Sequence, residues 1–144
     1  MRGARKLCDS VRMAFGVLIV DDNGLFLEAA RALLEREGLR VVGVAATSAE
    51  ALQRAEELRP EVVLVDITLG NESGFELARR LAGQCPGDGP AVILISTHSG
   101  ADFADLIAGS PAAGFVPKPE LSADAIRRIV DGRARPGPGG VSAR

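Results

Sequence analysis

The chain has no tryptophan or tyrosine and only five phenylalanines. Proteins that grip single-stranded nucleic acids stack the bases on aromatic side chains, so this composition argues against that function. The chain also has no large excess of charge of one sign: it has 17 Lys and Arg and 19 Asp and Glu, which gives a net charge of -2. A nucleic-acid-binding face is usually strongly basic. We therefore expect no direct nucleic-acid binding by this segment.

Cysteine is scarce and long apolar runs are missing. The two cysteines, Cys8 and Cys85, show neither metal-ligand spacing nor a disulfide framework. A reduced protein of the cytoplasm is the simplest interpretation. No run reaches the length of a membrane span, so we expect no membrane contact. The first apolar run continues directly into Asp21, Asp22 and Asn23, without the small-residue cleavage site of a secretory signal.

The 144 residues are the length of one domain, and 47% apolar content is enough for a hydrophobic core. Residues 1–16 show no clear period and are expected to form an N-terminal extension. A regular pattern, with short β-branched runs alternating with helical stretches, occupies residues 17–132. Residues 133–144 are rich in Pro and Gly, which predicts a disordered tail or the start of a linker.

The alternation predicts an α/β fold. Capping boxes formed by Thr47 with Glu50 and by Ser73 with Glu76 mark the starts of two helices. The runs are apolar throughout, as in strands covered on both faces. We expect a doubly wound, five-stranded parallel sheet with helices on both faces. The predicted strands cover residues 17–20, 41–45, 62–65, 92–95 and 114–116.

Charged residues follow three of these runs. Asp21 and Asp22 end the first run, Asp66 ends the third and Lys118 follows the fifth. Parallel neighbouring strands would bring them together at the carboxyl edge of the sheet, where such folds bind ligands. Clustered carboxylates repel unless a cation or a shared proton intervenes, and such a pocket suits a hard divalent ion. One aspartate would be left to act as a nucleophile.

Taken singly, these residues have simpler explanations. Asp22 is equally well explained as the cap of the helix that begins near Gly24, and Lys118 as a solvated loop lysine. Their joint placement at strand ends favours a functional site.

Four motifs in chain order resemble the receiver domain of two-component response regulators, the CheY-like family. The resemblance covers about residues 17–131, and each motif lies at a predicted strand end. It implies the flavodoxin-like strand order 2-1-3-4-5 for the predicted sheet. The motifs are Leu18-Ile19-Val20-Asp21-Asp22, Val63-Leu64-Val65-Asp66-Ile67-Thr68-Leu69-Gly70 with Ser73-Gly74, Leu94-Ile95-Ser96-Thr97, and Gly114-Phe115-Val116-Pro117-Lys118-Pro119.

The resemblance implies a chemistry for the acidic residues. Asp66 would accept a phosphoryl group from a sensor histidine kinase or a phosphotransfer protein, by in-line attack of its carboxylate. The expected cofactor is Mg²⁺, which takes few protein carboxylates and keeps several waters. Its implied ligands are Asp22, Asp66 and the backbone carbonyl of Thr68, with Asp21 acting directly or through water.

The resemblance also implies a switch. Lys118 would pair with one phosphoryl oxygen as a point charge, and Ser96 would hydrogen-bond another. Phe115 would turn toward the core, although a static core phenylalanine explains it equally well. The face formed by about residues 100–131 would change and alter the contact with a partner or output domain, or with a second copy in a homodimer. A cis Lys118–Pro119 bond is expected to aim the lysine inward.

The chain departs from the family pattern at one position beside the acceptor. Gly70 stands where the family usually has proline, and glycine is expected to loosen that loop. Thr68 lies where side chains can gate attacking water, or it is a simple loop threonine. His98 is the only histidine, and a solvated loop residue is its simplest interpretation.

Two other function classes compete with a phosphoacceptor switch that is not an enzyme. A phosphatase of the haloacid dehalogenase type also uses an aspartate nucleophile with Mg²⁺, but Thr68 stands where its acid would be. An inert interaction module would not need the acidic trio and Lys118. Only 13 residues follow Asp131, too few for a DNA-binding module, so either a stand-alone receiver or a fragment of a longer regulator is expected.

Overall fold

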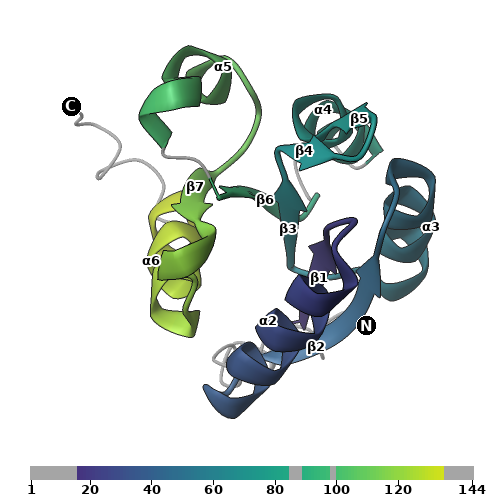
Figure 1. Cartoon of the computed structure of the whole chain (residues 1–144), viewed down its shortest axis with the longest axis vertical. Helices are drawn as coiled ribbons and strands as arrows, with labels where there is room; N and C mark the ends of the chain where they lie inside the picture. Colours follow the sequence, from purple (N-terminus) through teal and green to yellow (C-terminus); the bar gives the residue numbers. More distant parts are fainter. Residues whose placement is uncertain (1–15, 85–88, 98–99, 135–144) are drawn as a thin grey trace.

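The computed structural model describes residues 16–84, 89–97 and 100–134. Its centre is a five-stranded, all-parallel sheet in the order β2-β1-β3-β6-β7, which confirms the predicted flavodoxin-like topology (Figure 1). The elements of the sheet are β1 (Gly16–Val20), β2 (Arg40–Ala45), β3 (Val62–Asp66), β6 (Ala91–Ser96) and β7 (Gly114–Pro117). The helices are α2 (Gly24–Arg36), α3 (Ser48–Leu58), α4 (Gly74–Gln84), α5 (Ala104–Ala108) and α6 (Ala123–Ala134).

The three central strands are apolar on both faces because both faces are covered. Successive side chains of a strand point to opposite sides of the sheet. In β1, Leu18 and Val20 join the core under α3 and α4, whereas Val17 and Ile19 join the core under α2 and α6. Figure 1 shows the two pairs of helices on either side of the sheet. This burial explains why the runs could be recognised in the sequence.

Side-chain caps fix where the helices begin. Asn23 caps α2, since its side-chain oxygen accepts hydrogen bonds from the backbone N–H groups of Leu25 (3.0 Å) and Phe26 (3.2 Å). The alternative in which Asp22 caps this helix is therefore wrong, and the Asp22 carboxylate is left for another role. At α3 the predicted capping residues make their hydrogen bonds. Glu50 N–H donates to Thr47 (3.2 Å) and the Glu50 carboxylate accepts from Ala46 N–H (2.8 Å).

Three features differ from the expected pattern. The segment between β6 and β7 forms a 3₁₀ turn, Gly100–Phe103, followed by the five-residue α5. A short antiparallel hairpin, β4 (Thr68–Leu69) and β5 (Glu72–Ser73), follows Asp66 and was not anticipated. The last helix continues to Ala134 and so extends into residues 133–144, which were expected to form a disordered tail or the start of a linker. Within the described residues, no helix combines the length and apolar character that crossing a membrane requires.

Candidate functional site

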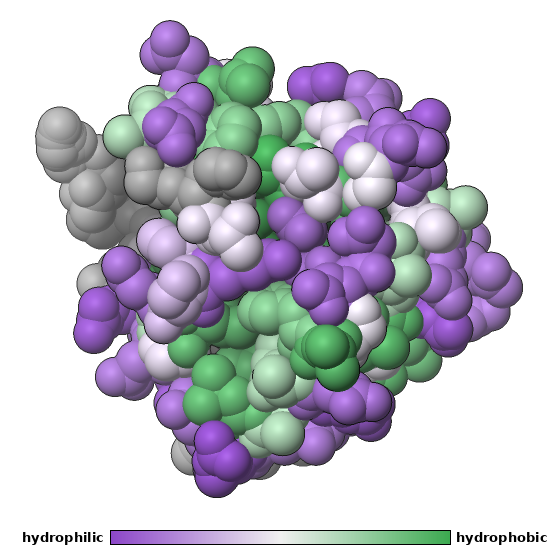
Figure 2. Space-filling view, viewed as in Figure 1, coloured by the Kyte–Doolittle hydropathy of each residue, from purple (hydrophilic) through white to green (hydrophobic). Residues whose placement is uncertain are grey.

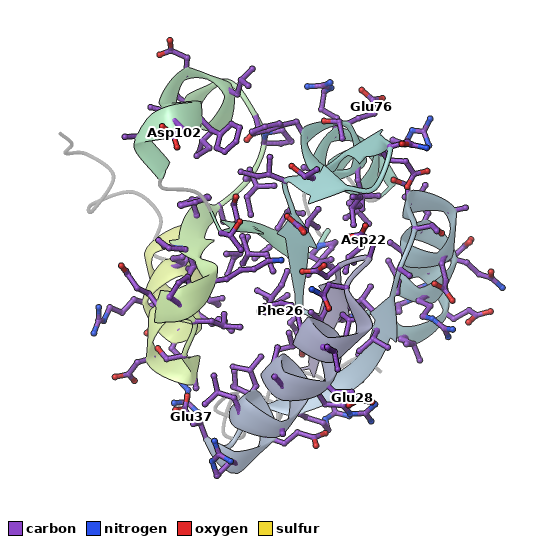
Figure 3. The ribbon with its side chains drawn as sticks, viewed as in Figure 1. Asp22, Phe26, Glu28, Glu37, Glu76 and Asp102 are labelled. Carbon is purple, nitrogen blue, oxygen red and sulfur yellow. The ribbon has the colours of Figure 1, made fainter. Side chains whose placement is uncertain are left out.

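The predicted site residues do lie at one edge of the sheet. Asp21 follows β1, Asp66 ends β3, Ser96 ends β6 and Lys118 follows β7. These four strands are consecutive neighbours in the sheet, so their carboxyl ends form a continuous row. One carboxylate oxygen from each of Asp21, Asp22 and Asp66 lies within 4.8 Å of the other two. Figure 3 shows Asp22 at this edge, beside the start of α2.

Asp21 is the buried member of the trio, with an exposed fraction of 0%. Its Oδ1 accepts a hydrogen bond from the backbone N–H of Asn23 (2.8 Å). Its Oδ2 forms an ion pair with Lys118 Nζ at 2.6 Å. That oxygen has no hydrogen bond of suitable geometry to any group in the described part of the chain. A buried anionic oxygen in this position retains the capacity to bind a further cation or a water molecule.

Asp66 lies between a backbone donor and a cation. Its Oδ1 accepts from Thr68 N–H (3.1 Å), and its Oδ2 accepts from Lys118 Nζ (3.2 Å). Burial raises the pKa of the Asp66 carboxyl, and the neighbouring charge of Asp21 raises it further. The Thr68 N–H and Lys118 act in the opposite direction but do not cancel the effect. Burial, followed by the charge of Asp21, therefore disfavours the ionised form of Asp66.

The raised pKa of Asp66 predicts how the free energy of unfolding depends on pH when no metal is added. Because the folded pKa of Asp66 lies above the unfolded value, the folded state binds more protons between the two values. The contribution of Asp66 to the free energy of unfolding therefore falls as pH rises through this window, and it stays low at neutral pH. Urea unfolding in a chelator, from pH 7 down to pH 4, should show a smaller rise or a larger loss of stability in Asp66→Asn than in wild type. Superimposable pH profiles of the two proteins would contradict this.

Lys118 is the cation of the site, and its side chain is only 12% exposed. Burial alone would lower the pKa of Lys118, but the carboxylates of Asp21 and Asp66 outweigh burial and the pKa is raised. The expected cis Lys118–Pro119 bond is wrong, since this bond is trans. Trans is the lower-energy isomer of an X–Pro bond in the absence of other constraints. Here Lys118 begins a 3₁₀ turn, Lys118–Glu120, and its ammonium contacts both aspartates with the bond trans.

Asp22 is the exposed member of the trio and faces the β4–β5 hairpin. A Cβ atom placed on Gly70 would lie 3.5 Å from Asp22 Oδ2. Gly70 has a φ of +59°, which L-residues rarely adopt and proline cannot. With Asn71 it forms the two-residue connection between β4 and β5. Glycine therefore permits a tight hairpin at this point, and the expected loosening of the loop stays a prediction.

The hairpin is tied to α3 by a residue that the sequence did not single out. The carboxylate of Glu72 accepts a hydrogen bond from the backbone N–H of Ser48, at the first residue of α3, at 2.8 Å. The hairpin thus fixes the chain that follows Asp66 against the neighbouring helix. The only signal for this contact in the sequence was an acidic residue, Glu72, six positions after Asp66. Its partner Ser48 lies 24 residues away in the sequence, so the spacing did not point to it.

Gly74 allows α4 to begin directly beneath the acceptor. A Cβ atom at this position would lie 2.1 Å from the backbone oxygen of Asp66 and 2.8 Å from the Cα of Ile67. The backbone N–H of Gly74 donates to the Ile67 oxygen at 2.8 Å. Only glycine fits this approach, so Gly74 holds the two ends of the acceptor loop together.

The other predicted residues are placed as follows. Ser96 is 3% exposed at the end of β6, in the row that contains Asp66. The Thr68 side chain is exposed beside the pocket. Phe115 is half-buried and packs against the core under α3 and α4. Cys8, Cys85 and His98 lie outside the described residues, as do residues 1–15 and 135–144, for which the sequence predicts an extension and a tail.

The family model of the response regulator receiver domain matches residues 17–131. This chain belongs to that family. It is a receiver domain of the kind found in the response regulators of two-component signalling. Such domains typically bind Mg²⁺ at an acidic pocket, and the trio of aspartates occupies the corresponding edge of the sheet.

Known proteins resemble this receiver domain in sequence and in structure. A putative transcriptional regulator of Pseudomonas aeruginosa is 36% identical over 104 residues, which are 72% of this chain and 49% of that protein. The response regulator GacA of Pseudomonas viridiflava is 32% identical over 114 residues, 78% of this chain and 52% of that protein. The solved structure of a LuxR-family response regulator from Aurantimonas matches with a TM-score of 0.74 at 30% identity, covering 83% of this chain and 86% of that one.

The receiver domain accounts for only part of such relatives. The chain spans about half the length of the two curated relatives named above.

Proposed function

We propose that this receiver domain is a phosphoacceptor switch in which Asp66 takes a phosphoryl group from a sensor histidine kinase or a phosphotransfer protein. The single observation that carries the proposal is the position of Lys118. Its ammonium contacts the carboxylates of both Asp21 and Asp66, 2.6 Å and 3.2 Å away, although the three residues come from different strand ends. A lysine that only balanced surface charge would not be held at 12% exposure between two aspartates.

The reaction is an in-line displacement at phosphorus. One carboxylate oxygen of Asp66 forms a bond to the phosphorus, the bond from phosphorus to the donor nitrogen breaks, and that electron pair stays on the donor. The Thr68 N–H holds the Asp66 carboxyl group in a fixed orientation. The transfer depends on positioning and on neutralisation of charge rather than on further covalent chemistry.

The acidic trio fits a magnesium ion. Asp22, Asp66 and the backbone carbonyl of Thr68 would hold it, with Asp21 as a direct or water-mediated ligand. Three carboxylates gather here around the single ammonium of Lys118, and burial together with the charge of Asp21 raises the pKa of Asp66, so the described pocket is short of positive charge. When bound, the ion supplies neutralisation of the oxygens on the transferred group.

Formation of the acyl phosphate changes the partners of Lys118. The carboxylate charge on Asp66 is lost, so the ammonium is free to pair with a phosphoryl oxygen. The hydroxyl of Ser96, on the next strand in the row, donates to a second phosphoryl oxygen. We expect Phe115, which lies on the strand β7 that leads directly into Lys118, to turn inward when Ser96 moves.

This change is transmitted to the face formed by α5, β7 and α6. Leu106 of α5 is 57% exposed on this face and offers an apolar contact for a partner. A partner protein, an output domain or a second copy of the receiver in a homodimer is the expected target. We place this activity in the cytoplasm, in residues 17–132, with no enzymatic activity beyond slow self-dephosphorylation and no direct contact with nucleic acid or membrane.

The test is incubation with acetyl phosphate and magnesium, followed by intact mass and by mapping of the modified peptide. A stable adduct of one phosphoryl group on Asp66 supports the proposal. Continuous release of phosphate from several phosphate esters would indicate a phosphatase instead. If neither an adduct nor turnover appears with an active donor, the domain is an inert interaction module and the proposal fails.

Magnesium is expected to stabilise the folded domain. At 100 times its dissociation constant, a ligand that binds only the folded state adds about 2.7 kcal/mol to the free energy of unfolding. Thermal unfolding with and without magnesium should show this gain in wild type and a much smaller one in Asp22→Asn. Asp102→Asn, an exposed aspartate far from the pocket in Figure 3, serves as the matched control and should respond like wild type. An equal response of all three proteins would place the ion elsewhere.

A further inference from the structure

The ammonium of Lys118 has a third neighbour that none of the motifs includes. Its Nζ lies over the ring of Phe26, 4.4 Å from the ring centroid. A cation within about 6 Å of an aromatic centroid is attracted by the negative face of the ring. Figure 3 labels Phe26 near Asp22, at the beginning of α2.

Phe26 is anchored so that its ring stays in this place. Its backbone N–H is held by the Asn23 cap (3.2 Å), and its ring packs against the core under α2 and α6. The cap holds the backbone of Phe26, and the core restrains one side of its half-buried ring.

The three neighbours together enclose the ammonium. Lysine has three N–H donors, and among the described residues Nζ contacts Asp21, Asp66 and the face of Phe26. The two carboxylates attract the ammonium strongly but also change during the reaction, because Asp66 loses its charge on phosphorylation. The ring is the neighbour whose charge distribution does not change.

We propose that Phe26 is a positioning residue that holds Lys118 toward the acceptor through a cation–π contact. This inference rests on the proposed function of Asp66 as phosphoacceptor. The ring keeps water from one side of the ammonium, and as a neutral group it does not compete with a phosphoryl oxygen for the charge. Lys118 is thereby ready to pair with the phosphoryl group without first being reoriented or desolvated.

Three replacements at position 26 separate this role from simple packing. Phe26→Leu removes the π face and keeps an apolar side chain. Phe26→Tyr keeps the π face. Site-specific incorporation of 3,4,5-trifluorophenylalanine keeps the shape of the ring but withdraws electron density from its face. The initial rate of phosphorylation by acetyl phosphate with magnesium is measured for each, together with the melting temperature.

We expect the leucine variant to be about three- to thirtyfold slower than wild type, the range that corresponds to the strength of cation–π contacts. The fluorinated protein should be slowed in the same direction with an unchanged melting temperature, and the tyrosine variant should stay within about twofold of wild type. A fluorinated protein as fast as wild type, or a tyrosine variant as slow as leucine, would overturn the proposal.

A double-mutant cycle tests whether Phe26 acts through Lys118. In a Lys118→Met background, Phe26→Leu should cause no further slowing, because the cation is gone. Equal slowing in both backgrounds would assign Phe26 a merely structural role. If Lys118→Met forms no adduct at all, the fluorinated and tyrosine proteins decide the question.

A readout independent of phosphorylation distinguishes failure of this inference from failure of the proposed function. The Hε protons of Lys118 should show an upfield ring-current shift in wild type and Phe26→Tyr that is lost in Phe26→Leu. If the shift is present but no phosphoryl adduct forms, the contact between Lys118 and Phe26 is confirmed and the proposed acceptor role of Asp66 is wrong. If the shift is absent in wild type, the proposed contact is wrong.

Discussion

Replacement of Asp66 by asparagine is expected to abolish the phosphoryl adduct, with a loss of about a thousandfold or more, as when a nucleophile is removed from an enzyme. The physical reason is that an amide oxygen lacks the charge and nucleophilicity of the carboxylate oxygen. The fold should survive, because the side-chain oxygen of asparagine still accepts from Thr68 N–H and Lys118 keeps Asp21 as a partner. The measurement is intact mass after incubation with acetyl phosphate and magnesium.

The control separates loss of the nucleophile from loss of structure. Asp102→Asn removes one exposed carboxylate outside the pocket and should be phosphorylated at the wild-type rate. Circular dichroism and the melting temperature of Asp66→Asn should match or exceed those of wild type at pH 7, since burial raises the pKa of Asp66 and the ionised group is unfavourable there. A phosphoryl adduct of normal yield on Asp66→Asn would show that the acceptor is another residue.

Alanine at position 74 is expected to be strongly destabilising. The added Cβ would stand 2.1 Å from the Asp66 oxygen, a backbone atom that cannot rotate away. Either α4 or the acceptor loop must then shift, and overpacking of this kind costs about 1–3 kcal/mol or more. The same shift displaces Asp66, so phosphorylation should slow as well. Urea unfolding and the rate of adduct formation measure the two effects.

The matched control is Gly83→Ala, near the other end of the same helix. A Cβ atom at Gly83 would meet no atom within 4 Å. Alanine is the better helix former by about 0.5–1 kcal/mol, so this variant should be as stable as wild type or slightly more stable. If Gly74→Ala behaved like Gly83→Ala, the close approach of α4 to the acceptor would be wrong.

The layered fold could be predicted from the sequence because burial imposes a pattern of apolar residues on the sequence. The strands β1, β3 and β6 are covered on both faces, so each is apolar except for the polar last residues of β3 and β6, and the helices between them carry one apolar stripe. The strand ends could be predicted for the same reason, since Asp21, Asp66 and Ser96 are the first polar residues after continuous apolar runs. Their family pattern then indicated the site.

The features that were missed depend on contacts between distant segments. The contact of Lys118 with Phe26 joins residues 92 positions apart, and Glu72 meets Ser48 across 24 positions. No local period or spacing encodes such pairs. The trans form of the Lys118–Pro119 bond could not be predicted from the sequence either. The free-energy difference between the cis and trans isomers of an X–Pro bond is small, so the surrounding structure decides which one forms.

The sequence by itself determined the β/α order, the parallel sheet and the polar residues at its strand ends, because hydrophobic burial and short-range capping leave periodic signals. Only the tertiary structure decided which cap holds α2, how Gly70 turns the hairpin and why Gly74 must lack a side chain. It also decided that an aromatic ring covers the lysine. These properties arise from distances between atoms that the fold brings together, and a linear pattern contains no record of those distances.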